Sequence, residues 1–207
     1  LYCGFFQNAA HQSAEDDYVE ALIEEIEAAA DAPRLKGGLI HAVFIGGGTP
    51  TSLSAENAAR VLSTLRRVLP LANDYELTLE GRIHDLVPEK IEAWLANGVN
   101  RISLGVQSFD TKVRQSQGRI ETREEVLERL KLLKSYEQCS VVLDLIYGLP
   151  GQSMEVWQHD LDDLIASGID GADFYQLNVF EGSDLNKRIA EGKLDPAATT
   201  KEQAKMY

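Results

Sequence analysis

Short apolar runs alternate along the chain with longer amphipathic segments. The runs have the length and the bounding polar or glycine residues of strands, whereas the segments space their apolar residues three and four positions apart, as on one face of a helix. The runs predict strands at residues 39–45, 76–79, 101–107, 140–146 and 174–179. The segments predict helices at residues 14–30, 55–68, 88–97, 123–135 and 154–167, and a further helix that begins after residues 199–200.

Hydroxyl residues mark where most of these helices begin. Ser13, Ser54, Thr122 and Ser153 each precede an amphipathic segment, where a side-chain oxygen can accept hydrogen bonds from unpaired backbone N–H groups. No repeat, linker or low-complexity segment interrupts the alternation of strand and helix. The order predicts one α/β domain over residues 1–207, built as a parallel sheet with outer helices, either an open sheet or a segment of a barrel.

One strand end is unusually rich in glycine. The run at residues 42–45 stops at three consecutive glycines, residues 46–48, which precede Thr49 and Pro50. Glycine removes the side chains there, so a ligand can lie directly against backbone N–H and C=O groups. A glycine-rich turn without a ligand has the same local sequence, and the polar residues at the other strand ends therefore matter.

Polar residues follow or interrupt the other predicted strands. Glu80 follows the second strand and Gln107 ends the third, whose exit loop contains Arg119. Asp144 interrupts the fourth strand, which is otherwise apolar, and a charge in such a run needs a partner. The carboxyl ends of parallel strands share one edge, where ligands bind. Each residue alone also fits an ordinary structural role, but together they predict a ligand site.

Composition and charge exclude several classes of protein. The chain is 44% apolar and 26% charged, as in a soluble globular domain, and its formal charge of -13 would repel a nucleic acid. No apolar stretch approaches the ~18 residues of a membrane span, and no signal-peptide pattern opens the chain. We therefore expect a cytoplasmic enzyme with no nucleic-acid partner. Cys3 and Cys139 are too few for a disulfide framework.

Both ends of the sequence look internal to a longer protein. The chain begins with Leu1 rather than methionine, and it stops at Tyr207 inside a predicted helix. We expect the chain to be a fragment.

Four ordered motifs resemble one enzyme family. They are Tyr-Cys-Gly-Phe at residues 2–5, Gly-Gly-Gly-Thr-Pro-Thr at 46–51, Gly-Val-Gln-Ser-Phe at 105–109 and Asp-Leu-Ile-Tyr-Gly-Leu-Pro-Gly at 144–151. The chain is similar to radical S-adenosylmethionine (SAM) enzymes related to oxygen-independent coproporphyrinogen oxidase. Three further segments resemble the heme-utilisation branch of that group, which opens heme anaerobically; they are residues 79–84, 176–180 and 192–194.

The resemblance implies an iron–sulfur cluster and a binding platform for SAM. In the family, three cysteines spaced CxxxCxxC bind a [4Fe–4S] cluster, whose open iron holds the amine and carboxylate of SAM. Cys3 matches the third cysteine, and the first two would precede Leu1. Gly47, Gly48 and Thr49 match the backbone platform for the methionyl end of SAM.

Four polar residues match the remaining SAM contacts of the family. Glu80 matches the acid that holds the polar end of the ligand, and Arg119 matches the cation near its carboxylate. Gln107 and Asp144 match the ribose contacts. These matches are chemically sensible, because a carboxylate pairs with a guanidinium and hydroxyl groups pair with amide and carboxylate oxygens.

The resemblance also implies a fold and a reaction. The family fold is a partial (β/α)6 barrel of the TIM type, and its first strand would precede the cluster motif and so be missing here. The cluster would cleave SAM reductively, and a carbon radical or a transferred methyl group would act on heme or a porphyrinogen. The heme-utilisation branch implies methyl transfer with ring opening, and electrons would come from a donor such as flavodoxin or ferredoxin.

We expect this 207-residue chain to be inactive by itself. One cysteine of the motif, Cys3, cannot hold the cluster alone. Cys139 cannot replace the others, because it precedes its strand and so lies at the opposite end of the sheet.

Two departures from the oxidase relatives weigh against porphyrinogen decarboxylation. Phe5 stands where those relatives have a fourth cysteine, and residues 82–84 replace their Asn-Pro or Asp-Pro turn. Arg82 and His84 are candidate tetrapyrrole contacts, Arg82 for a propionate and His84 as an iron ligand or proton donor. Three alternatives stay open: a coproporphyrinogen III oxidase, a non-catalytic heme chaperone of the same fold, and a phosphate-binding barrel that uses the glycines as an anion nest.

Overall fold

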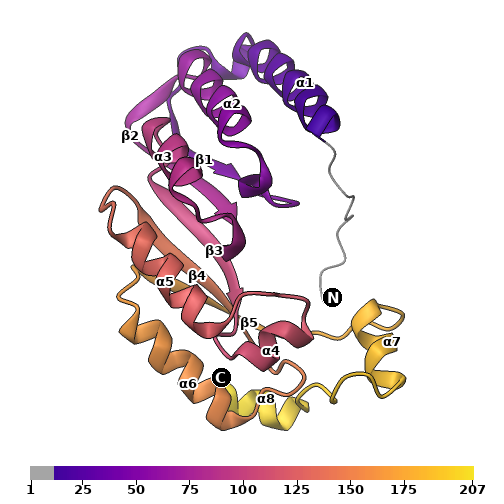
Figure 1. The fold of residues 1–207 in the computed structure, drawn as a ribbon. Helices are drawn as coiled ribbons and strands as arrows, with labels where there is room; N and C mark the ends of the chain where they lie inside the picture. Colours follow the sequence, from indigo (N-terminus) through magenta and orange to yellow (C-terminus); the bar gives the residue numbers. More distant parts are fainter. Residues whose placement is uncertain (1–11) are drawn as a thin grey trace. The chain divides into compact units, whose positions relative to one another are not determined.

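The structure is a computed structural model that describes residues 12–207, and these alternate between strands and helices (Figure 1). The described strands form one sheet in the order β1-β2-β3-β4-β5, in which β1 pairs with β2 and β4 pairs with β5 in parallel. The predicted α/β half-barrel of parallel strands is confirmed. The strands are Ile40–Ile45 (β1), Leu71–Gly81 (β2), Arg101–Gln107 (β3), Ser140–Tyr147 (β4) and Gly171–Gln176 (β5).

One α-helix precedes the first described strand, and helices follow every strand. They are Gln12–Ala30 (α1), Ala55–Val68 (α2), Pro88–Ala96 (α3), Thr111–Ser116 (α4), Arg123–Lys134 (α5), Met154–Ala166 (α6), Asp184–Ala190 (α7) and Thr200–Met206 (α8). Short 3-10 helices cover Pro33–Leu35, Pro50–Ser52 and Ile83–Asp85. Within residues 12–207, no helix is both long enough and apolar enough to cross a membrane.

The predicted helix caps are confirmed at three positions. The hydroxyl oxygens of Ser54, Thr122 and Ser153 accept hydrogen bonds from backbone N–H groups in the first turns of α2, α5 and α6. Thr122 also forms a capping box with Glu125. Ser13 does not precede its helix as predicted, because the described part of α1 already includes it.

The fifth strand lies earlier than predicted. The sequence predicts a strand at residues 174–179, whereas β5 covers Gly171–Gln176 and pairs with β4 from Gly171, opposite Val142. Leu177 leaves the strand and is buried in a core cluster, so the apolar run continues beyond the point where strand pairing stops.

Strand β2 begins at Leu71, five residues before the strand predicted at residues 76–79, and three other elements also differ from the prediction. Helices α4 and α7 are not predicted, because six and seven residues are too few to show helical periodicity. The apolar run at residues 42–45 has the composition of a buried strand, but β1 exposes Phe44 at 60%. It lies at the edge of the described sheet, and the helices bury only its other face, through Val43 and Ile45.

The described chain packs as two compact units. The first, here the amino-terminal unit, contains residues 12–103 and 136–140. Its α1 and α2 pack over β1 through Val19, Val61 and Leu65. Polar contacts join the same helices, because Glu15 accepts hydrogen bonds from the Ser54 N–H at 2.8 Å and from the Asn57 side chain at 2.9 Å.

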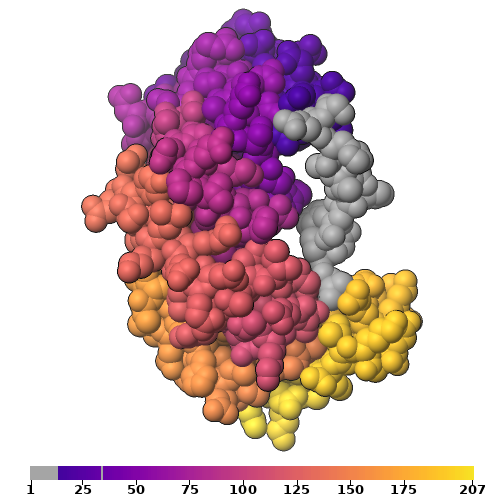
Figure 2. Space-filling view, in the orientation of Figure 1, coloured from indigo at the N-terminus to yellow at the C-terminus, as the bar shows by residue number. Residues whose placement is uncertain are grey.

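The second, here the carboxyl-terminal unit, contains residues 104–135 and 141–207. Trp157 of α6 packs against Tyr147 and Phe174 with ring centroids 5.8 Å apart in each pair. Figure 2 shows the segment around α7 as a yellow lobe at the surface of this unit. That lobe joins the unit through Leu185, which is buried against Ile146 and Leu177. The prediction of a single domain over residues 1–207 stays a prediction.

An ion pair at the amino end of β5 generates a prediction about pH. The Asp170 carboxylate accepts the Val141 N–H at 2.7 Å and Lys134 Nζ at 3.0 Å. The Val141 N–H, and then Lys134, hold the pKa of Asp170 below its ordinary value of 3.8 although partial burial opposes them. The lowered pKa stabilises the folded state above pH 3.8, and this stabilisation is lost as the pH falls through the folded-state pKa.

We expect Asp170→Asn to lower the free energy of unfolding by about 1 kcal/mol at pH 7, the usual worth of one such hydrogen bond. Urea unfolding should show a difference between variant and parent that shrinks as the pH falls below 3.8 and the parent carboxylate also becomes protonated. Asp162→Asn is the matched control, because that exposed carboxylate accepts only a side-chain hydrogen bond from Gln158. A pH-independent difference would contradict the assignment.

Candidate functional site

The glycine loop of the amino-terminal unit contacts the predicted cofactor acid. The Gly47 N–H donates a hydrogen bond to Oε2 of Glu80 at 3.1 Å, and Glu80 lies near the end of β2. A Cβ atom on Gly46 would lie 2.6 Å from the same carboxylate oxygen, so only glycine leaves room for Glu80 there. Gly47 and Gly48 are exposed, and nothing lies within 4 Å of a Cβ built on either. The structure thus brings two predicted site segments together.

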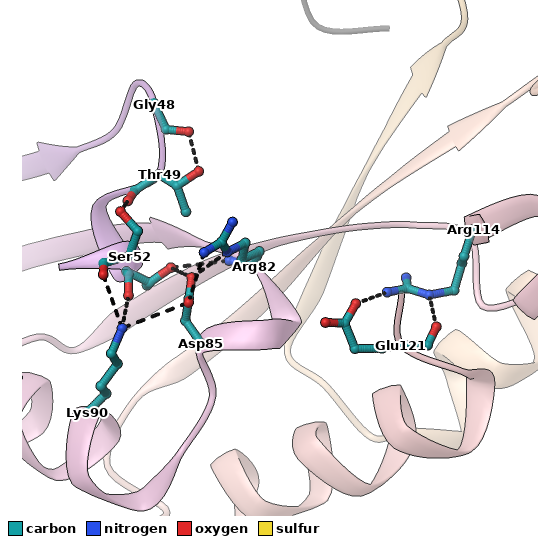
Figure 3. Close-up of polar contacts among 9 residues, drawn as sticks. Gly48, Thr49, Ser52, Arg82, Asp85, Lys90, Arg114 and Glu121 are labelled. Atoms are coloured by element: carbon teal, nitrogen blue, oxygen red, sulfur yellow. Dashed lines mark hydrogen bonds and ion pairs between the residues drawn. The ribbon is translucent and has the colours of Figure 1, made fainter. Parts of the chain in front are cut away.

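Thr49 and the 3-10 helix Pro50–Ser52 continue the loop (Figure 3). The Thr49 hydroxyl donates to the Gly48 carbonyl, and the Ser52 hydroxyl donates to the Thr49 carbonyl at 2.7 Å. These local bonds hold the polypeptide close to the glycines. The loop therefore presents backbone groups and one threonine side chain rather than a bulky residue.

A buried carboxylate, Asp85, fixes the end of this loop (Figure 3). It is 4% exposed and accepts hydrogen bonds from Thr51 Oγ1 at 2.9 Å and from Arg82 Nε at 2.8 Å. Lys90 donates to the Thr51 carbonyl at 2.9 Å. Thr51 in turn packs against Gly81, where an added Cβ would lie 2.4 Å from the threonine methyl. These contacts tie the loop to the residue that follows Glu80.

Sequence reasoning missed Asp85 and Lys90. The available signal was one acidic residue, Asp85, between the apolar residues Ile83 and Leu86, which are both buried in the structure. Arg82 and His84, which were predicted, lie on the same turn. The guanidinium of Arg82 is paired with Asp85 and its side chain is 41% exposed, whereas His84 is exposed. Whether either residue contacts a tetrapyrrole stays a prediction.

In the carboxyl-terminal unit, Gly105 brings Gln107 and Arg119 together. Both side chains lie beside the position where a Cβ on Gly105 would stand, Gln107 Nε2 at 2.6 Å and Arg119 Nη2 at 3.5 Å. Gln107 is buried and has a φ of 72°, a left-handed conformation that glutamine rarely adopts. An amide and a guanidinium therefore lie side by side at the end of β3.

Asp144 is half-buried in β4 and is aligned with Asp173 of β5. Phe174 packs against Trp157 on the helix side of the sheet, so Asp144, Asp173 and Tyr175 belong to the opposite face. Asp173 and Tyr175 were not predicted. Their alternation with Phe174 becomes visible only once β5 is assigned to Gly171–Gln176.

A second buried carboxylate, Asp160, joins two exit loops of the carboxyl-terminal unit. It accepts the Phe109 N–H at 2.6 Å, the Ser108 hydroxyl at 2.8 Å and the Gln152 amide at 3.0 Å. Gln152 also accepts the Gly148 N–H at 2.8 Å. Burial raises the pKa of Asp160, although these hydrogen bonds oppose the shift. The loops that follow β3 and β4 are thus held by one carboxylate.

Asp160 also lines a cleft of 320 Å³ on the helix side of this unit. The cleft is lined by residues of α6, by Arg123 at the start of α5 and by Asp110 in the loop after β3. Its most prominent charges are already paired, because Arg123 forms two hydrogen bonds with Asp163 at 2.6 and 2.5 Å. We therefore do not assign the ligand site to it.

The cysteines were predicted to differ in role. Cys3 lies outside the described residues, and so do Tyr2 and Phe5. Within residues 12–207, no three His, Cys, Asp or Glu side chains gather as metal ligands. Cys139 directly precedes β4, at the amino end of the strand as predicted, and is half-buried.

Comparison with known proteins agrees with the motifs. The model of the Radical SAM superfamily matches residues 1–164. Anaerobilin synthase from Escherichia coli O157:H7 is 42% identical over 192 residues, which cover 93% of this chain and 43% of that protein. Heme chaperone HemW from Escherichia coli K12 is 35% identical over 179 residues, which cover 86% of this chain and 47% of that protein. The chain spans about half the length of the curated relatives that it matches.

Solved structures agree with the fold. Coproporphyrinogen III oxidase (HemN) from Escherichia coli, described as a radical SAM enzyme, superposes with a TM-score of 0.86 and 25% identity. The superposition covers 99% of this chain and 46% of that one. The family model covers well over half of the chain, and the glycine loop, Glu80, Gln107 and Arg119 are arranged within it as described above. The chain belongs to the radical SAM superfamily.

Proposed function

We propose that the protein containing this chain is a radical SAM enzyme that degrades heme anaerobically, by methyl transfer coupled to ring opening. The observation that carries the proposal is the 42% identity to anaerobilin synthase over 93% of the chain. The identity to heme chaperones is lower, at 35% and 33% for the two proteins from Escherichia coli K12 and Haemophilus influenzae. The departures from the oxidase pattern at residue 5 and residues 82–84 support the same branch.

The described residues fit the polar groups of SAM. The backbone of Gly47 and Gly48 and the carboxylate of Glu80 suit the methionyl end, because an ammonium group pairs with a carboxylate. Because Gly46 and Gly105 have no side chain, the polar side chains of Glu80 and Gln107 can lie against them. The fit supports the assignment of Gly47, Gly48, Thr49, Glu80, Gln107, Arg119 and Asp144 to cofactor binding.

Different residues would bind different parts of SAM. Arg119 would hold the carboxylate of the ligand, and Gln107 and Asp144 would hold the ribose hydroxyls. When bound, the [4Fe–4S] cluster supplies the electron that cleaves SAM, and Cys3 would be one of its thiolate ligands. The electron would come from a small donor protein such as flavodoxin or ferredoxin.

Arg82 and His84 are our candidates for contacts to the tetrapyrrole. Asp85 binds the Nε edge of the Arg82 guanidinium, at 2.8 Å from Nε and 3.3 Å from Nη2. A guanidinium has a second edge that can pair with another carboxylate, so a propionate is a suitable ligand. His84 is exposed on the same turn and can donate a proton or ligate iron.

A heme chaperone is the second candidate, because the HemW proteins are similar along most of the chain. The experiment that separates the two uses the full-length protein, reconstituted with iron and sulfide without oxygen and supplied with SAM, reduced flavodoxin and heme. We expect methylated, ring-opened product together with consumption of SAM. Bound but unmodified heme would support a chaperone, and decarboxylated coproporphyrinogen in a parallel assay would support the oxidase.

Arg119 generates the first prediction about cofactor binding. We expect Arg119→Ala in the full-length protein to weaken SAM binding by about 1.5 to 3 kcal/mol, the range for hydrogen bonds to charged groups. Isothermal titration calorimetry measures the loss, and circular dichroism checks that the fold is unchanged. Equal affinities would refute the carboxylate contact.

Gly105 generates the second prediction about cofactor binding. A methyl group at this position would displace the end of the Gln107 side chain, which is flexible, so the fold should tolerate Gly105→Ala while SAM binding weakens by about 1 kcal/mol, as for one lost hydrogen bond. The matched control is Gly171→Ala, since Gly171 is also in a strand of this unit and an added Cβ there would stand 3.6 Å from its nearest neighbour. Equal losses in both variants would contradict a role for Gln107.

Arg82 and His84 generate a prediction about heme binding. We expect the double variant Arg82→Ala, His84→Ala to bind heme more weakly, by about tenfold, because one charged contact and one polar contact are lost. Titration of the heme absorption band measures the affinity. Arg66→Ala, on the exposed face of α2, is the control. Unchanged heme affinity in the double variant would refute both tetrapyrrole contacts.

A further inference from the structure

Arg114 is a buried charged residue that is not among the proposed SAM ligands. Its side chain is 1% exposed and lies on α4, directly after β3. Nη1 donates to the carbonyls of Val106 at 2.7 Å and of Ser108 at 3.1 Å. Nε donates to the Glu121 carbonyl at 2.9 Å, and Nη2 donates to the Glu121 carboxylate at 3.2 Å (Figure 3). A guanidinium with this many partners can join several segments at once.

The two carbonyls at Nη1 lie on either side of Gln107. The φ of 72° at Gln107 places the residue in the left-handed region, which is unfavourable for a residue other than glycine. Such a conformation persists only where neighbouring contacts hold it. Arg114 supplies two of these contacts, because its Nη1 binds the carbonyls of Val106 and Ser108, the residues before and after Gln107.

The contacts of Arg114 with Glu121 close the loop that contains Arg119. The Arg119 N–H donates to the Arg114 carbonyl at 3.0 Å, and the Arg114 side chain reaches Glu121, two residues beyond Arg119. Glu121 is itself 6% exposed. The loop is therefore held at its start and at its end by the same residue. Arg119 Nη2 and Gln107 Nε2 then lie beside one glycine, Gly105.

We propose that Arg114, neutralised by Glu121, is a positioning residue for SAM binding that fixes Gln107 and Arg119 together. The inference rests on the proposed function, because it takes Gln107 and Arg119 as ligands of the ribose and the carboxylate. Arg114 does not itself touch the ligand. Its effect passes through the backbone of Gln107 and through the loop of residues 114–121.

The chemistry of the contacts requires arginine. A lysine would keep the charge, but its single ammonium group cannot reach two carbonyls on one side and a carbonyl with a carboxylate on the other. Removing the charge would instead leave Glu121 buried without its cation, which is strongly destabilising. Arg114→Lys is therefore the informative variant, because it tests the geometry while it keeps the charge.

The control for stability is Arg123→Lys. Arg123 belongs to the same unit and also forms a forked pair with a carboxylate, Asp163, at 2.6 and 2.5 Å. Arg123 contacts Thr111, Glu124 and Asp163 rather than Gln107, Arg119 or Glu121. The control should lose a similar kind of ion pair without a change in SAM affinity.

The experiment measures SAM affinity by calorimetry in the full-length protein, without turnover. We expect Arg114→Lys to bind SAM about tenfold more weakly, as when one charge-assisted contact is misplaced, and Arg123→Lys to bind as the parent does. In a Gln107→Ala background, Arg114→Lys should cost clearly less than it does alone, because the two residues act through one contact. Additive losses would overturn the positioning role through Gln107.

Amide hydrogen exchange supplies a readout that needs no ligand. We expect Arg114→Lys to speed exchange in residues 107–121 and to leave β4 and α6 protected, whereas Arg123→Lys should leave residues 107–121 unchanged. If parent protein binds SAM but Arg114→Lys matches it in both affinity and exchange, only the positioning role is wrong. If the parent protein does not bind SAM at all, the proposed function is wrong and the positioning role with it.

Discussion

Backbone groups that leave a sheet still have to be hydrogen-bonded when they are buried, and this constraint determines the strand exits of this protein. At the end of β3, Arg114 binds the carbonyls of Val106 and Ser108, and Asp160 binds the N–H groups of Phe109 and Asp110. The cation thus binds peptide carbonyls, and the anion binds peptide N–H groups. After β2, Asp85 acts on side chains instead, through Thr51 and Arg82. A buried charge without partners would be costly, so each of these residues needs all of its contacts.

At these strand exits, three glycines are needed for the space that a missing side chain leaves rather than for an unusual backbone conformation. Gly46, Gly81 and Gly105 do not have the positive φ that favours glycine; each instead lies where a Cβ would collide with a polar side chain. The side chains concerned are those of Glu80, Thr51 and Gln107. The absence of a side chain is what allows carboxylate, hydroxyl and amide groups to approach the main chain. Gly47, with a φ of 107°, is the glycine of the loop that needs its conformational freedom.

The fold by itself does not select among the activities of its relatives. The superposition on coproporphyrinogen III oxidase has a TM-score of 0.86 with only 25% identity, and a shared scaffold can hold different reactions. Residues 82–84, one of the two departures from the oxidase pattern in the sequence, belong to Arg82 and the turn Ile83–Asp85 that follows it. Asp85 fixes that turn to the glycine loop, so the candidate cofactor segment and the candidate substrate segment of the amino-terminal unit share one buried carboxylate.

The sequence by itself determined the order of strands and helices, three of the caps and the identity of the candidate cofactor residues, because periodicity, hydroxyl caps and the glycine motif are local signals. It misplaced β5 and missed α4, since apolar residues continue past the strand and six residues show no period. Only the tertiary structure showed the roles of Asp85, Arg114 and Asp160. Each looks like an ordinary surface charge in sequence, and its partners became known only when folding buried it beside backbone groups from another segment.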